Sequence, residues 1–320
     1  MDNTKISKHL GKTSKYKSKY DSSLLVREER SSNRVHLKIK DDDLPFKGSD
    51  VWNAYEVSAL TDSGLPVTGV IKMVYGCTSK YIVESKSFKL YLNSFNMTPL
   101  GDTATEVAAN IQQVVIKDLS QLLDTEVEVV FATNSQILKC KISPYWEWDH
   151  GISNSSSEEH YTHAKDSLLP VYSTIEEDYV LNEVNFTKYQ EDPKLLKVVK
   201  SECARVCYHS SLLKSNCRVT SQPDWGDVYI YIKKEGETID PISMLKYIIS
   251  FRDECHFHEE ICETIYKRIW DKLKPEELSV KCLYARRGGI DINPERVSKN
   301  SLMHVALSDP KIPHVKTPKQ

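Results

Sequence analysis

The sequence lacks the features that mark a membrane protein or a secreted protein. No stretch approaches the roughly 18 consecutive apolar residues that span a bilayer, and residues 1–20 contain no apolar segment of the kind found in a secretion signal. The formal net charge is only -2, so no charge-driven partner such as nucleic acid is implied. We therefore expect a cytoplasmic protein with no nucleic-acid and no membrane partner.

Glycine loops that bind nucleotides are also missing. Neither G-x-G-x-x-G nor G-x-x-x-x-G-K-[ST] occurs, so a nucleotide would have to bind outside the usual glycine-loop folds. The chain has 8 cysteines, but without a secretion signal we interpret them as free thiols rather than as a disulfide framework. One of these thiols could be a nucleophile.

The first half of the chain predicts a tail followed by strands and one long helix. Residues 1–30 are rich in Lys, Ser and Asn, which is typical of a mobile tail, although its lysines could also contact RNA. Residues 31–150 form the first predicted module. A capping box of Thr103 and Glu106 opens its helix, and alternating residues predict strands before and after it, including one over 135–142.

The second half repeats this order. Residues 151–166 are polar and Ser-rich and predict a linker, and residues 167–320 form the second predicted module. There Asp240 and Pro241 predict the start of a helix, and a second helix and a strand follow. The pattern predicts an α+β fold of two similar modules, each with helices on one face of an antiparallel sheet.

A polar segment in the second module, LLKSNCRVTSQPDWGD, carries the best candidate for nucleophilic chemistry. A turn between Cys217 and Asp224 could fold the carboxyl group back toward the sulfur, and Lys214 and Arg218 flank the cysteine. A cysteine attacks as its thiolate, which nearby cations favour. Asp224 could donate a proton if the site holds its pKa high. An inert thiol and a plain turn residue would look the same.

Three other segments carry polar groups suited to ligands. Residues 83–96 (VESKSFKLYLNSFN) mix lysines and hydroxyls that could bind phosphate, and Arg287 precedes Gly288 at a glycine pair that allows close backbone approach. Cys255, His258 and Cys262 share a helix face, but about 11 Å separates the ends of that span at roughly 1.5 Å per residue. This is too far for one zinc ion, so we expect no metal.

Taken together, these segments resemble the 7-cyano-7-deazaguanine reductase family in its longer, two-module form. The resemblance runs from about Leu10 to about Arg296 and includes FKGSDVW, ESKSFKLYL, SNC with QPDWG, and SFRDECHFHEE. It implies tandem tunnelling-fold modules, a homodimer, and sites at the interfaces between modules. It also implies NADPH as the cofactor and 7-cyano-7-deazaguanine as the small-molecule substrate.

The resemblance also implies roles for individual residues. Cys217 would attack the nitrile to form a covalent thioimide, and Asp224 would donate the proton, with two NADPH used per turnover. The implied substrate contacts are Val83, Glu84, Ser85, His258 and Glu259. The implied NADPH contacts are Ser85, Lys86, Arg287 and Gly288.

Other activities remain open at this point. A relative that attaches an amidine to tRNA through the same cysteine would lack the ESKSFKLYL segment, and a protein that only binds deazaguanine would lack Cys217 or Asp224. A zinc-dependent cyclohydrolase of the same fold would need metal ligands. Nitrile reduction is therefore the preferred hypothesis.

Overall fold

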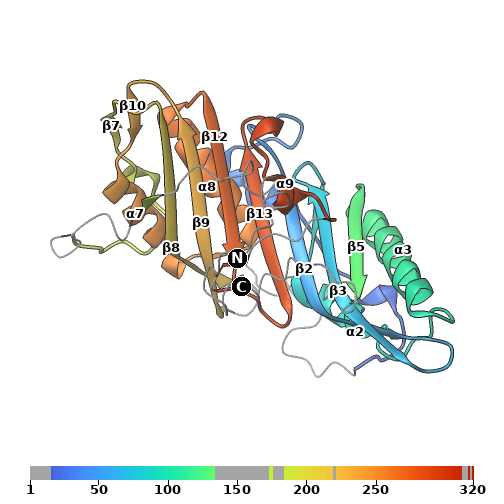
Figure 1. The fold of residues 1–320 in the computed structure, drawn as a ribbon. Helices are drawn as coiled ribbons and strands as arrows, with labels where there is room; N and C mark the ends of the chain where they lie inside the picture. Colours follow the sequence, from blue (N-terminus) through green and yellow to red (C-terminus); the bar gives the residue numbers. More distant parts are fainter. Residues whose placement is uncertain (1–15, 134–172, 176–183, 219–220, 312–315, 318) are drawn as a thin grey trace, which may run out of the picture.

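A single nine-stranded sheet runs through both halves of the computed structural model (Figure 1). The structure describes residues 16–133, 173–175, 184–218, 221–311, 316–317 and 319–320. The strand order is β11-β8-β9-β12-β13-β2-β3-β5, and β6 pairs with β8. Its strands are β2 (Lys47–Leu60), β3 (Pro66–Gly76), β5 (Val127–Thr133), β6 (Ser173–Thr174), β8 (Arg205–Cys217), β9 (Pro223–Lys233), β11 (Cys255–His256), β12 (Glu277–Tyr284) and β13 (Ile290–Val297).

The two halves join where β13 pairs with β2. This pairing is antiparallel and aligns Ile292 with Trp52 and Ile290 with Ala54. Residues more than 200 positions apart in the chain therefore become neighbours on one sheet. The junction brings side chains of both halves onto a common face.

The helices pack on one face of this sheet. In the first half these are α2 (Ser85–Asn93) and α3 (Ala104–Leu123), and in the second half α7 (Pro241–Ile249) and α8 (His258–Leu273). Each pair covers its own apolar core, one built around Phe88 and Ile111 and the other around Ile230 and Ile265. The predicted α+β class, with helices on one face of largely antiparallel strands, is confirmed.

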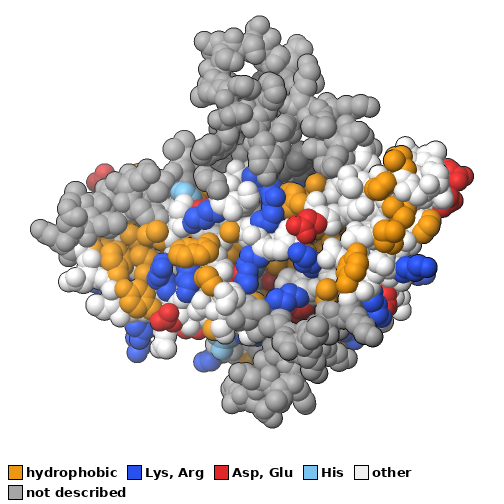
Figure 2. Space-filling model, turned by 90° about the horizontal axis from the view of Figure 1, so that it is seen from below, with side chains coloured by type: hydrophobic (Ala, Val, Ile, Leu, Met, Phe, Trp, Pro, Cys, Tyr) orange, Lys and Arg blue, Asp and Glu red, His pale blue; other side chains and the backbone are white. Residues whose placement is uncertain are grey.

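Two small sheets and several short helices complete the described chain. β1 (Arg27–Glu29) pairs with β4 (Tyr81–Val83), and β7 (Val198–Lys200) pairs with β10 (Glu237–Ile239). The short helices are η2 (Ser22–Leu24), α1 (Arg30–Arg34), η3 (Val35–Leu37), η5 (Pro193–Leu195), η6 (Ser250–Asp253), η7 (Asn300–Leu302) and α9 (Val305–Ser308). Seen from below, apolar side chains lie in separate strips between Lys and Arg side chains (Figure 2).

Residues 16–30 differ from the tail that the sequence predicts over 1–30. The Tyr20 ring packs 5.1 Å from that of Phe95, and its hydroxyl donates to Asp118 at 2.7 Å. β1 adds backbone pairing with β4. A single aromatic anchor and one short strand do not produce apolar periodicity, so a lysine- and serine-rich composition conceals them. Residues 1–15 lie outside the described residues.

Local signals predicted two helix starts correctly. Thr103 and Glu106 form the reciprocal capping box at the start of α3, and Asp240 caps α7 by accepting from the Ser243 backbone at 2.7 Å. The strand predicted over 135–142 and the linker over 151–166 lie outside the described residues. The module boundaries therefore stay a prediction.

Candidate active site

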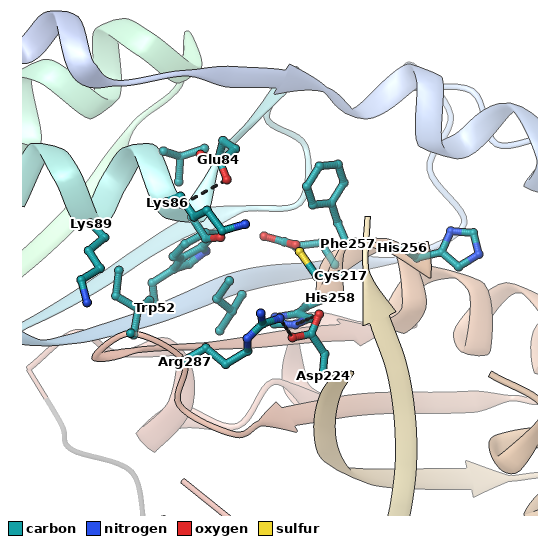
Figure 3. A pocket seen from close by; sticks show the side chains of 16 residues that line it. Trp52, Glu84, Lys86, Lys89, Cys217, Asp224, His256, Phe257, His258 and Arg287 are labelled. Atoms are coloured by element: carbon teal, nitrogen blue, oxygen red, sulfur yellow. Dashed lines mark hydrogen bonds and ion pairs between the residues drawn. The ribbon is translucent and has the colours of Figure 1, made fainter. Parts of the chain in front are cut away.

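A pocket of about 250 Å³ opens between the two halves. Both halves contribute to its lining, with Glu84 and Lys86 on one side and Cys217, Asp224 and His258 on the other (Figure 3). All ten predicted site residues line it: Val83, Glu84, Ser85, Lys86, Cys217, Asp224, His258, Glu259, Arg287 and Gly288. The structure thus brings them together, while their individual roles stay predictions.

Glu84 is fixed in the pocket wall because it caps a helix. It follows β4 directly, and its carboxylate accepts the backbone N–H groups of Lys86 at 3.1 Å and Ser87 at 2.7 Å at the start of α2. A carboxylate at a helix N-terminus is stabilised by the exposed N–H groups there. The cap also sets where the Lys86 side chain starts, so one local motif positions two pocket residues.

Strand register brings Cys217 and Asp224 to the same face. In the antiparallel pair of β8 and β9, Asp224 lies opposite Ser215, and Cys217 is two residues further along β8. Residues two apart on a strand point to the same side. The Cys217 backbone N–H also donates to the Gln222 carbonyl at 2.8 Å, which closes the predicted turn between the two residues.

Asp224 lies between two partners. His258 Nε2 is 3.3 Å from one carboxylate oxygen, and the Arg287 guanidinium binds the other. Burial raises the pKa of Asp224, but His258 and Arg287 outweigh it, so the pKa lies below its usual value. The sequence hypothesis required a high pKa for a proton donor. In this state Asp224 is instead a carboxylate.

The imidazole of His258 is held by a stacked ring. Tyr284 lies parallel to it, with centroids 3.8 Å apart and an interplanar angle of 9°. The stack fixes the plane in which His258 Nε2 meets Asp224. His258 Nδ1 is buried and has no hydrogen-bond partner among the described residues, so it is free to contact a ligand.

The cations near Cys217 are not the ones that the sequence placed there. Lys214 donates to the Arg252 carbonyl at 2.5 Å, and Arg218 binds the Glu260 carboxylate at 2.8 Å. Lys86 and Arg287, from distant parts of the chain, are the cations that interact electrostatically with the Cys217 sulfur. Both favour the thiolate.

Several buried polar atoms of the pocket lack a hydrogen-bond partner among the described residues. They include Glu259 Oε1, Lys86 Nζ and Trp52 Nε1. Leaving such groups unpaired costs free energy unless a ligand or water satisfies them. They offer an acceptor and two donors within one cavity, which suits a polar, planar ligand with several N–H groups.

Sequence reasoning missed part of the lining: Trp52, His256, Phe257, Ile290 and Ile292. Trp52 lies in the recognised motif FKGSDVW but was not singled out, whereas Lys89 is one of the lysines of residues 83–96 that the sequence suggested for phosphate. Ile290 and Ile292 come from β13 and carry no chemical signal. Only their pairing with β2 shows that they face the pocket.

No group of three or more His, Cys, Asp or Glu side chains suited to a metal occurs among the described residues. The described helices include none that is long and apolar enough to cross a membrane.

Two family models match the chain. One described as "Nitrile reductase, 7-cyano-7-deazaguanine-reductase N-term" matches residues 16–131, and one described as "QueF-like protein" matches residues 223–302. The NADPH-dependent 7-cyano-7-deazaguanine reductase of Colwellia psychrerythraea is 37% identical over 301 residues, which cover 92% of this chain and 93% of that protein. The chain belongs to the 7-cyano-7-deazaguanine reductase family.

Other members of the reductase family show the same level of similarity. The protein of that name from Coxiella burnetii is 37% identical over 288 residues, 90% of each chain. A solved archaeosine synthase QueF-Like in the apo form covers 31% of this chain and 91% of its own, at 16% identity and a TM-score of 0.26. That similarity is too low to compare the folds in detail.

Proposed function

We propose that this protein reduces the nitrile group of 7-cyano-7-deazaguanine to the aminomethyl group with NADPH, through a covalent intermediate on Cys217. The observation that carries the proposal is the pocket itself. In a chain of this family, a half-buried thiol lies beside Lys86 and Arg287, and the same lining contains Glu259, whose Oε1 has no hydrogen-bond partner among the described residues.

The first chemical step is addition to the nitrile. The Cys217 sulfur forms a bond to the nitrile carbon, one π bond of the C–N triple bond breaks, and the nitrogen takes a proton, which gives a thioimide. Lys86 and Arg287 stabilise the thiolate before attack. This addition converts an unreactive nitrile into a C=N bond that accepts hydride.

Asp224 and His258 together supply the proton that the nitrile nitrogen takes. Their contact at 3.3 Å allows a proton to pass between them. Arg287 keeps Asp224 ionised in this state, and because Asp224 is buried, its pKa rises if the guanidinium moves away. Asp224 then becomes the proton donor that the family resemblance implies.

The cations and the glycine of the lining fit NADPH. Lys86, Lys89 and Arg287 supply cations for phosphate, and Gly288 has a φ of +58°, where a Cβ would come within 3.2 Å of Lys89 Nζ. Ser85, Lys86, Arg287 and Gly288 would hold the cofactor. Bound NADPH supplies hydride, and two equivalents are needed to convert a nitrile to an amine.

The reacting carbon stays in place through both reductions. After the first hydride reaches the thioimide carbon, the C–S bond breaks, the thiolate leaves and an imine remains. Breaking the C–S bond already restores Cys217, and the second hydride and a proton then convert the imine to the amine. Glu84, Glu259 and the backbone around Val83 hold the base during this sequence, since carboxylates accept the N–H groups of a guanine-like edge.

The test measures NADPH oxidation by absorbance with and without 7-cyano-7-deazaguanine. Wild type should consume about two NADPH per substrate, and Cys217→Ala should consume none. Cys255→Ala is the matched control, because Cys255 is exposed and does not line the pocket. Wild type that forms a mass adduct with the nitrile but oxidises no NADPH would sink the reductase proposal in favour of amidine transfer.

The assembly and the location belong to the same proposal. A homodimer in the cytoplasm, with tandem modules divided near 151–166, is consistent with the family. Light scattering of the purified protein would test the dimer.

A further inference from the structure

A buried cluster of five charged side chains adjoins the acidic face of α8. Arg30 binds Asp50, Arg34 binds Glu263 at 2.7 Å, and Arg296 binds both acids at 2.8 Å each. These side chains are at most 4% exposed. Arg34 also binds the more exposed Asp41 at 2.6 Å, so the three cations face three carboxylates in all.

Helical spacing connects the cluster to the pocket. Glu259 and Glu263 are one turn apart on α8, so they lie on the same side of the helix. Arg30 reaches toward this side, with Nη1 3.8 Å from Glu263 Oε1. Burial and Asp50 raise the pKa of Glu259 to about 7, while Arg30 and His258 oppose the rise.

Charged and titratable side chains from five elements act on Glu259. They are Arg30 (α1), Asp50 (β2), Tyr75 (β3), His258 (α8) and Tyr284 (β12). Burial raises the pKa of both tyrosines well above their usual value, so they are neutral. Burial and then Asp50 therefore oppose the ionisation of Glu259, while Arg30 and His258 favour it.

We propose that Arg30 is a positioning residue for substrate binding, whose buried guanidinium favours the ionised form of Glu259, the form that accepts the N–H groups of the substrate. This inference rests on the proposed function. Arg30 belongs to the N-terminal segment of the first half, whereas Glu259 belongs to the second. On this proposal, a residue outside the pocket lining acts across the junction on a buried acid of the pocket.

The test measures the dissociation constant of 7-cyano-7-deazaguanine by calorimetry across pH 5.5 to 9, in a Cys217→Ala background that prevents covalent capture. Binding should weaken as pH falls and Glu259 becomes protonated. Arg30→Met should move the midpoint upward by on the order of one pH unit, weakening binding about fivefold at pH 7 and about tenfold at lower pH. Binding should recover at pH 9, which a merely misfolded site would not do.

Arg34→Met is the matched control. Arg34 comes from the same helix, is equally buried and also binds Glu263, but its other partners are Asp41 and the Cys77 carbonyl. The Arg34→Met variant should be less stable but should have an unchanged pH midpoint of substrate binding. Arg30→Lys should also leave this midpoint unchanged. Equal midpoints for Arg30→Met and Arg34→Met would overturn the inference.

A second variant keeps the inference testable if Arg30→Met fails to fold. Asp50→Asn removes the charge that opposes ionisation of Glu259 and retains the side-chain shape, so its midpoint should move to lower pH. An unchanged or higher midpoint would overturn the inference. No binding at any pH by the Cys217→Ala parent would instead overturn the proposed function.

Discussion

Glu259 is a buried carboxyl group, and burial disfavours its ionised form. The side chain is 3% exposed, and burial, followed by Asp50, raises its pKa from 4.5 to about 7. A raised carboxyl pKa means that the folded state binds more protons than the unfolded state between these values. Stability is therefore lost as pH rises from 4.5 through about 7.

Replacing Glu259 with Gln should remove this cost. At pH 8 we expect Glu259→Gln to be more stable by on the order of 1–3 kcal/mol, with little difference at pH 5, as measured by thermal unfolding. Glu260→Gln is the contrasting control, because Glu260 binds Arg218 and His256 and its loss should destabilise at both pH values. Equal effects of Glu259→Gln at the two pH values would contradict the prediction.

Arg287 controls the proton on Asp224. Arg287→Met should raise the pKa of Asp224, because burial raises this pKa and Arg287 would no longer lower it alongside His258. If protonated Asp224 is needed for thioimide formation, the alkaline limb of adduct formation should move to higher pH. The adduct forms without NADPH, so mass spectrometry separates this effect from cofactor binding. Arg287→Lys keeps the charge and should shift the limb less. A limb that stays in place would argue against this role.

At the scale of elements, short capping motifs fix where the pocket-bearing segments start. Glu84 both caps α2 and lines the pocket. Thr103 caps α3 and does not line the pocket. The start of α3 was predicted because a cap depends on residues within one turn, whereas the cap at Glu84 was not singled out in the sequence. The segment over 16–30 was not predicted either, since its contacts with β4 and α3 lie 50 or more residues away.

The cap of α3 should contribute measurably to stability. Thr103→Ala removes the side-chain acceptor of the Glu106 N–H and should cost about 1 kcal/mol in the free energy of unfolding. Thr105→Ala, in the same exposed turn, leaves the cap intact and should cost less. Urea unfolding of both variants makes the comparison, and equal losses would show that the cap is not responsible.

At the scale of the whole molecule, the two halves share one sheet and one buried ionic cluster. Arg296 on β13 binds Asp50 on β2 and Glu263 on α8. Removing one member of a buried ionic group leaves unpaired charge, which is strongly destabilising. The junction that forms the pocket is therefore also the part of the described chain that links the stability of both halves.

Arg296→Met should lower the stability of both halves together. We expect a loss on the order of 3–5 kcal/mol, with tryptophan fluorescence and circular dichroism following one urea transition. Lys267→Met, which removes an ion pair exposed on its Asp271 side, should cost far less. Separate transitions in which only one probe shifts would show that the halves unfold independently.

The sequence by itself determined the fold class, the helix starts at Thr103 and Asp240, the family and the ten pocket residues, because caps, alternation and motifs depend on nearby residues. Only the tertiary structure decided which charges meet. Pairing of β13 with β2 placed Ile290 and Ile292 in the pocket. Folding also brought Lys86 and Arg287 to Cys217 in place of the sequence neighbour Arg218. Electrostatic interactions depend on distance in space, and strand register, which spacing along the chain does not reveal, sets that distance.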